Sequence, residues 1–212
     1  RCAAQTDSGA GTCVGRALPG VELRIIRITD EPIAAWRNDL AVRPGEVGEI
    51  IARSPAVTRG YFRLPAADAV SKIHDGATLW HRIGDVGRID EEGRLWFAGR
   101  RSHRVETREG VLFTECCEPV YNVHAAVARC ALVGVGPVGD KEPVLIVEPV
   151  GGRLPRGAAR DQLVRELLSL GEEVAHTRAI RRVLFHRSLP VDVRHNAKIN
   201  REWLAAWAER RS

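Results

Sequence analysis

A hairpin between residues 86 and 98 is the pattern that most constrains how this chain can fold. Two short runs rich in β-branched and aromatic residues occur there, Val86–Ile89 and Leu95–Ala98. They are separated by Asp90-Glu91-Glu92-Gly93, a polar segment ending in glycine that is typical of a tight turn. The sequence therefore predicts two antiparallel strands joined by a turn at residues 90–93.

Two polar residues flank this hairpin and suggest ligand binding. Asp85 follows Gly84, where a small residue lets a ligand approach the backbone, and a carboxylate can accept hydrogen bonds from two vicinal hydroxyls. Arg100 follows Gly99, and its planar guanidinium suits phosphate or ribose oxygens. Each residue has a plainer interpretation as well, because Gly-Asp is common in turns and an arginine after a strand is commonly solvated.

Length and composition fit a globular protein with one large or two modest domains. The chain has 212 residues, of which 44% are hydrophobic and 28% charged. It contains no methionine and opens at Arg1, so we interpret it as part of a longer polypeptide. No apolar run approaches the roughly 20 residues of a membrane span, and we expect no such span.

The net charge of +5 raises the possibility of nucleic-acid binding. The basic residues are mostly arginines interleaved with acids, and only residues 178–182 and 209–211 approach a basic cluster. A solvated surface explains them better.

The five cysteines show no C-x-x-C spacing, which argues against a disulfide framework or a zinc site and favours a reducing cytoplasm.

The predicted elements change in character near residue 101. The first fifteen residues are predicted to be a loop, followed by strands at 21–28 and 48–54, an irregular connection at 29–45, and a short helix from Pro65. Beyond residue 102, helices and strands are both predicted. The helices are expected at 115–122, 161–170 and 199–207, and the strands at 103–107, 127–135, 144–150 and 180–185.

One helix shows its apolar face clearly, and one familiar motif is misleading. Leu163, Val164, Leu167 and Leu168 fall on one side of the helix predicted at 161–170. Residues 134–139 satisfy G-x-G-x-x-G, but a strand rather than a helix is predicted to follow, so we set a dinucleotide fingerprint aside.

Several blocks in order resemble the adenylate-forming superfamily of acyl-CoA synthetases, luciferases and peptide-synthetase adenylation domains. The blocks are Val14–Gly20, Gly45–Ile50, Gly60–Phe62, Gly84-Asp85 and Gly99-Arg100. The resemblance implies an α/β superfamily fold, in which Asp85 holds the ribose hydroxyls of ATP and Arg100 also contacts the nucleotide. It also implies a domain division. Residues 1–101 would be a mostly β remnant of the large domain, its small barrel part, and residues 102–212 an α+β C-terminal lid, with the hinge near Ser102.

Near the C-terminus, Leu189–Arg201 resembles the superfamily motif that carries the catalytic lysine, which would be Lys198. Adenylation brings a substrate carboxylate against the α-phosphate of ATP, and the two anions repel. A mobile ammonium offsets this repulsion and stabilises the charge of the transition state. The resemblance therefore implies ATP as cosubstrate, with Mg²⁺ on its phosphates.

Three segments resemble the β-lactone synthetases of long-chain olefin biosynthesis more specifically: His103–Thr107, Tyr121–His124 and His195–Ile199. In addition, residues 107–118 lack the glycine pair common where CoA ligases admit their thiol arm. The resemblance implies adenylation of a long-chain 2-alkyl-3-hydroxy acid, whose own hydroxyl then displaces AMP. His103 and His195 are candidate accessory residues.

Three alternatives remain beside this hypothesis. A fatty acyl-CoA or acyl-AMP ligase would share every adenylation residue. A folded, non-catalytic fragment would act only when docked on an N-terminal portion of the same enzyme, and a nucleic-acid binder is the third. Because the phosphate-binding loop and the adenine pocket lie upstream in the family, we expect this chain alone to be inactive. Other olefin-biosynthesis enzymes are candidate partners.

Overall fold

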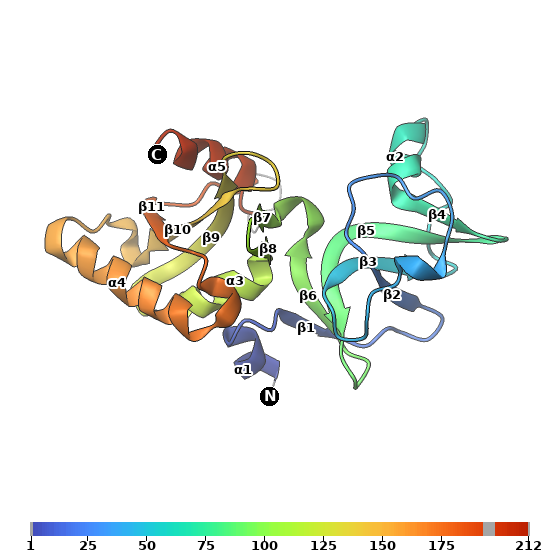
Figure 1. Cartoon of the computed structure of the whole chain (residues 1–212), viewed down its shortest axis with the longest axis horizontal. Coiled ribbons are helices and arrows are strands. Elements are labelled where there is room, and N and C mark those ends of the chain that lie inside the picture. Colours follow the sequence, from blue (N-terminus) through green and yellow to red (C-terminus); the bar gives the residue numbers. More distant parts are fainter. Residues whose placement is uncertain (1, 193–197, 212) are drawn as a thin grey trace. The chain divides into compact units, whose positions relative to one another are not determined.

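The computed structural model describes residues 2–192 and 198–211, which form two units (Figure 1). The β unit is Gly11–Ser102, and the α/β unit combines Arg1–Ala10 with His103–Ser212. Each unit is described below by itself.

The β unit is built on one curled sheet of six antiparallel strands, in the order β1-β6-β5-β3-β2 with β4 also paired to β5 (Figure 1). Short helices lie in its connections. The strands are β1 Thr12–Gly15, β2 Glu22–Ile26, β3 Gly48–Arg53, β4 Lys72–Asp75, β5 Thr78–Ile89 and β6 Leu95–Arg100. The helices are the 3₁₀ turn η1 Asn38–Leu40 and α2 Pro65–Ser71. A further 3₁₀ turn, η2 Arg101–His103, begins in this unit and ends at the first residue of the next segment of the α/β unit.

Strand β5 is the centre of this sheet, and its second half confirms the predicted hairpin. It pairs with β4 near its start, with β3 along its middle and with β6 at its end, where Ile89 faces Leu95. Asp90 closes the turn, because its carboxylate accepts the Arg94 N–H at 2.8 Å and the Trp96 indole N–H at 2.7 Å. A polar turn residue thus fixes the register of the pair.

The core of the β unit contains a fully buried tryptophan, Trp80. Aliphatic side chains from three strands and from η1 pack with it, and the guanidinium groups of Arg24 and Arg53 lie 4.7 and 4.4 Å from its ring. The buried members of the cluster are Ile26, Leu40, Ile51, Ile73 and Trp80.

A buried ion pair fastens the long connection after β2 to this sheet. Arg82 of β5 donates two hydrogen bonds to Glu49 of β3, at 3.0 and 2.7 Å, and both side chains are at most 1% exposed. The same guanidinium donates to the carbonyls of Glu31 and Thr29, at 2.8 and 2.5 Å. Arg101 also donates to the Thr29 carbonyl, at 2.7 Å. The described residues of the connection that was predicted to be irregular contain no strand, and the connection is held by these side chains together with two isolated β-bridges, Ala35 to His74 and Ala41 to Ile26.

The α/β unit contains a three-stranded mixed sheet in the order β11-β10-β9 and a separate two-stranded pair, β7-β8 (Figure 1). The strands are β7 Val105–Thr107, β8 Gly110–Leu112, β9 Val127–Val135, β10 Glu142–Pro149 and β11 Arg182–Phe185. The helices are α1 Cys2–Asp7, α3 Thr114–Asn122, the 3₁₀ turns η3 Val150–Gly152 and η4 Ala175–Thr177, α4 Gly157–Glu173 and α5 Arg201–Glu209.

Helices cover both faces of the three-stranded sheet, which explains why its strands are continuously apolar. In Figure 1, α3 and α4 lie on one side of this sheet and α5 on the other. Leu132 and Leu145 pack against α3 and α4, while their neighbours Val133 and Ile146 pack against α5. The apolar face predicted for the helix at 161–170 is confirmed, since Leu163 and Leu167 are buried in the α4 side of the core.

The N-terminal loop prediction is wrong, because residues 2–7 form α1 and residues 12–15 form β1. Both depend on partners distant in sequence: α1 contacts α3, and β1 pairs with β6. Gly11 has φ +87°, and a Cβ there would lie 2.5 Å from the Phe97 carbonyl oxygen, so the approach to β6 requires glycine. Strands β4 and β8 were not predicted either.

Two features are absent from residues 2–192 and 198–211. No helix there has the length and apolar character needed to cross a membrane. Within the same residues, no group of three or more His, Cys, Asp or Glu side chains is arranged to hold a metal ion.

Candidate functional site

The structure brings together the two residues predicted to bind nucleotide. Asp85 and Arg100 face each other across the β5–β6 pair, and Arg100 Nη1 lies 2.8 Å from Asp85 Oδ1. Each follows a glycine with positive φ, Gly84 at +80° and Gly99 at +132°, and the pairing shifts register after Val86. These backbone features carry both side chains to the end of the hairpin opposite the turn.

This pair keeps capacity for a ligand. The Asp85 side chain is 21% exposed and that of Arg100 is 45% exposed. A carboxylate offers about four acceptor positions and a guanidinium five donors, the groups that ribose hydroxyls and phosphate oxygens pair with. Arg100 also holds the Asp85 carboxylate in a fixed direction.

The predicted hinge residue lies directly after a well-anchored segment. Ser102 is exposed and is the last residue of the β unit, and the half-buried His103 is the first residue of the following segment of the α/β unit. One residue earlier, Arg101 Nη1 donates to the Thr29 carbonyl and lies 3.4 Å from Glu49 Oε2. The chain is therefore fixed to the β unit up to Arg101.

Lys198 belongs to the α/β unit, where it is exposed at the end of a short antiparallel pairing. Val191 and Ile199 form a β-bridge, the Asp192 N–H donates to the Lys198 carbonyl at 2.8 Å, and the Asn200 N–H donates to the Pro190 carbonyl at 2.8 Å. We call this pairing of residues 190–192 with 198–200 the Lys198 bridge. His195, the other accessory candidate, lies outside the described residues.

Helix α5 begins immediately after the Lys198 bridge, and its start is well defined. The Asn200 side chain accepts the Trp203 N–H at 3.0 Å and so caps the helix. Arg201 Nη1 lies 2.8 Å from Glu118 Oε1 of α3. Burial raises the pKa of Glu118 to about 7, and Arg201 and the Leu132 N–H offset part of this effect.

No pattern in the sequence pointed to Glu118. Its partners Arg201 and Leu132 lie 83 and 14 residues away, so no local pattern reports the pairing. The available signal was a carboxylate next to Cys117, on a helix whose spacing places this position against the sheet.

A second buried cation, Lys72, holds a loop in the β unit. Its ammonium donates to the Thr58 carbonyl at 2.5 Å and lies 3.3 Å from Nδ1 of His81. Burial lowers the pKa of Lys72, and burial together with the Lys72 charge lowers the pKa of His81. Asp68 fixes the same loop by accepting the Tyr61 N–H at 2.7 Å. These residues stabilise the segment that carries the Gly60–Phe62 block.

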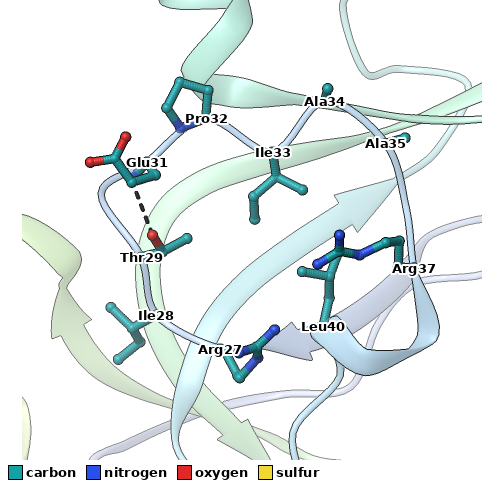
Figure 2. Close-up of a pocket in the computed structure, with 10 residues that line it drawn as sticks. All are labelled: Arg27, Ile28, Thr29, Glu31, Pro32, Ile33, Ala34, Ala35, Arg37 and Leu40. Atoms are coloured by element: carbon teal, nitrogen blue, oxygen red, sulfur yellow. Dashed lines mark hydrogen bonds between the residues drawn. The ribbon is translucent and has the colours of Figure 1, made fainter.

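The connection after β2 lines an open hollow of 610 Å³ (Figure 2). None of the predicted site residues lines it. The Thr29 and Glu31 carbonyls at its rim are already used by Arg82, and the Thr29 hydroxyl accepts the Glu31 N–H at 3.1 Å, the dashed line in Figure 2. We assign this hollow to the packing of the connection.

Comparison with known proteins supplies the family. No protein-family model matches the sequence. The chain is 47% identical over 213 residues to an olefin beta-lactone synthetase from Stenotrophomonas maltophilia, a match that covers 98% of this chain and 38% of that protein. It is 48% identical over 208 residues to an olefin beta-lactone synthetase from Xanthomonas campestris pv. campestris, covering 96% of this chain and 37% of that protein.

A solved structure supports the same relationship. O-succinylbenzoate coenzyme A synthetase from Bacillus subtilis, determined in complex with AMP, superposes with a TM-score of 0.69 at 25% identity. The superposition covers 91% of this chain and 35% of that one. The chain belongs to the adenylate-forming superfamily and corresponds to a C-terminal portion of its enzymes. Within that superfamily its curated relatives include the two olefin beta-lactone synthetases, of which it spans less than two fifths.

Proposed function

We propose that this chain is the C-terminal part of an ATP-dependent β-lactone synthetase that acts on long-chain 2-alkyl-3-hydroxy acids. The observation that carries the proposal is 47–48% identity to two olefin beta-lactone synthetases over 96–98% of the chain. The curled antiparallel sheet of the β unit fits the barrel part of the large domain, and the α/β unit fits the lid. The domains would then be residues 1–101 and 102–212, although α1 belongs to the α/β unit here.

In the first half-reaction, a carboxylate oxygen of the substrate attacks the α-phosphorus of ATP, and pyrophosphate leaves. Asp85 would accept hydrogen bonds from the ribose hydroxyls, held in place by the 2.8 Å contact with Arg100, which itself has donors left for nucleotide oxygens. Lys198, an exposed residue of the Lys198 bridge, would place its ammonium between the two anions and stabilise the transition state. Mg²⁺ bound to the ATP phosphates would add positive charge there.

In the second half-reaction, the 3-hydroxyl oxygen attacks the acyl carbonyl carbon of the adenylate. A four-membered ring closes, AMP leaves with the electrons of the broken acyl–oxygen bond, and the hydroxyl proton passes to a base. His103 and His195 are candidates for that base. An intramolecular hydroxyl needs no thiol channel, which agrees with the absence of a glycine pair in residues 107–118. A lid that turns at Ser102 would exclude water from both intermediates.

The proposal is tested with the enzyme that contains this chain and its upstream region. The enzyme is incubated with ATP, Mg²⁺ and a 2-alkyl-3-hydroxy fatty acid without CoA, and products are followed by proton NMR and mass spectrometry. Formation of β-lactone with one AMP and one pyrophosphate per turnover is expected. Acyl-AMP that accumulates until CoA is added, and then becomes a thioester, would replace this proposal with the acyl-CoA ligase alternative. We further propose that the enzyme is cytoplasmic and that other olefin-biosynthesis enzymes are its partners.

A further inference from the structure

One end of the Lys198 bridge is fastened to the sheet through Leu189, which is 1% exposed. The Leu189 N–H donates to Glu148 Oε2 at 2.6 Å, and its carbonyl accepts from Arg129 Nη2 at 3.1 Å. Arg129 and Glu148 are themselves paired across β9 and β10 at 2.8 Å. The residue before Pro190 is thus clamped on both its backbone groups.

The other end is fastened through Arg201, the first residue of α5. Its Nη1 lies 2.8 Å from Glu118 Oε1, and its Nη2 donates to Glu118 Oε2 at 3.0 Å. Glu118 Oε1 also accepts the Leu132 N–H at 2.8 Å. The side chains of Glu118 and Arg201 are 9% and 12% exposed, so this contact joins α3, β9 and α5 in a nearly dry environment.

Arg201 lies three residues after Lys198, a span of at most about 10 Å along an extended chain. Between them, Asn200 both caps α5 and donates its N–H to Pro190 across the Lys198 bridge. Any shift of the first turn of α5 therefore moves the backbone that carries Lys198.

We propose that Glu118 is a positioning residue for Lys198: through Arg201 it fixes the start of α5 and with it the Lys198 bridge, and so sets the rate of adenylation. The inference rests on the function proposed above for Lys198. Without the carboxylate charge, the Arg201 guanidinium is left buried without its counter-ion, and it lowers its free energy by moving toward water. That movement displaces the bridge, and a misplacement of about 1 Å in a reacting group can cost about 100-fold in rate.

The charge of Glu118 should make this effect depend on pH. The groups that face it are Arg201 from α5, Cys130 from β9, and Cys117 and Glu115 from its own helix. Because burial raises the pKa of Glu118 to about 7, the carboxylate takes up a proton as the pH falls through neutrality. The contact with Arg201 then loses its charge, and adenylation should slow between pH 8 and pH 6.

The test uses the enzyme that contains this chain. It measures the exchange of pyrophosphate into ATP that requires the carboxylic acid substrate. Glu118→Gln keeps an acceptor for the Leu132 N–H but removes the charge. It should lower kcat by about 10- to 100-fold, leave KM for ATP within about twofold, and remove the fall between pH 8 and pH 6. The matched control is Glu142→Gln, which removes the 2.8 Å contact of Glu142 with Arg182 between β10 and β11. It should behave as wild type, and a Glu118→Gln enzyme with wild-type kcat would overturn the inference.

A second readout is independent of activity. Amide hydrogen exchange is measured on this chain for the Asn200 and Asp192 N–H groups, which close the Lys198 bridge. Both should exchange at least about tenfold faster in Glu118→Gln than in Glu142→Gln, because local opening costs less when the anchor is lost. If Glu118→Gln does not fold, Arg201→Lys, which keeps the positive charge but loses the bidentate contact, takes its place in both assays. The same loss of kcat and the same faster amide exchange are expected, but the fall between pH 8 and pH 6 should remain, because Glu118 is still present.

The two proposals can fail separately. If the wild-type enzyme shows no pyrophosphate exchange that requires the carboxylic acid substrate, the proposed function is contradicted. Unchanged protection of Asn200 and Asp192 in the variant would contradict the positioning role of Glu118, whatever the activity.

Discussion

Arg100 Nη1 lies 2.8 Å from Asp85 Oδ1, so the two residues predicted to bind nucleotide are also partners of each other. Both lie beside a register shift in the β5–β6 pairing, on the side away from the turn, and each is preceded by a glycine of positive φ. The arrangement gives the proposed ribose acceptor a fixed direction before nucleotide binds, which lowers the cost of ordering it on binding.

The first prediction concerns this pair. Asp85→Asn in the enzyme that contains this chain should raise KM for ATP by about 10- to 100-fold, because a hydrogen bond to a charged group contributes about 1.5–3 kcal/mol. Asp39→Asn is the control, since Asp39 is exposed in the same unit and pairs with Arg27 and Arg37. Pyrophosphate exchange at varied ATP measures the effect. An Asp85→Asn enzyme with the KM of the control would show that Asp85 does not hold nucleotide.

The second prediction concerns the buried ion pair of the β unit. Glu49→Gln should lower the free energy of unfolding by about 3–5 kcal/mol, because it leaves the Arg82 guanidinium buried without its counter-ion. Glu22→Gln removes a more exposed contact with Arg53 and should cost less than about 1 kcal/mol. Urea unfolding of both variants measures the difference. If both variants lose the same free energy of unfolding, the role assigned to burial is contradicted.

The third prediction concerns acid stability at the β5–β6 turn. Burial acts to raise the pKa of Asp90, but hydrogen bonds from Trp96 and Arg94 outweigh it and hold that pKa well below its usual range. A depressed folded-state pKa stabilises the fold above the unfolded value near 4, and this contribution is lost as the pH falls toward the folded-state value. Asp90→Asn should therefore be less stable than Glu91→Gln, its exposed neighbour, at pH 7, and the difference should shrink as the pH falls from about 4 to 2. Urea unfolding across that range checks this, and a constant gap would contradict it.

Local patterns predicted much of the fold. Asp90 to Gly93 marked the hairpin, and the leucines of α4 marked a buried helix face, because both depend on residues close in sequence. Strand β1 and helix α1 could not be found this way, since β1 exists by pairing with β6 and α1 by contacting α3. Tertiary partners decided those elements.

In the candidate site as well, some residues could be predicted from short motifs, whereas the contacts between distant residues could not. Gly84-Asp85 and Gly99-Arg100 were found from short motifs, but their direct contact depends on the register shift after Val86. Glu49–Arg82 and Glu118–Arg201 join residues 33 and 83 positions apart, and no spacing rule links them. Charged residues inside otherwise apolar elements were the one available sign of these buried pairs.

The measurement that tests the account most directly separates the two half-reactions with Lys198→Ala in the enzyme that contains this chain. In a single turnover from free acid and ATP, the variant should form acyl-AMP at least about 100-fold more slowly than wild type, because it lacks the ammonium between carboxylate and α-phosphate. Supplied with preformed acyl-AMP, it should release β-lactone and AMP within about threefold of the wild-type rate, since charge at the α-phosphate is no longer needed. If the variant forms acyl-AMP at the wild-type rate, the role assigned to Lys198 is contradicted.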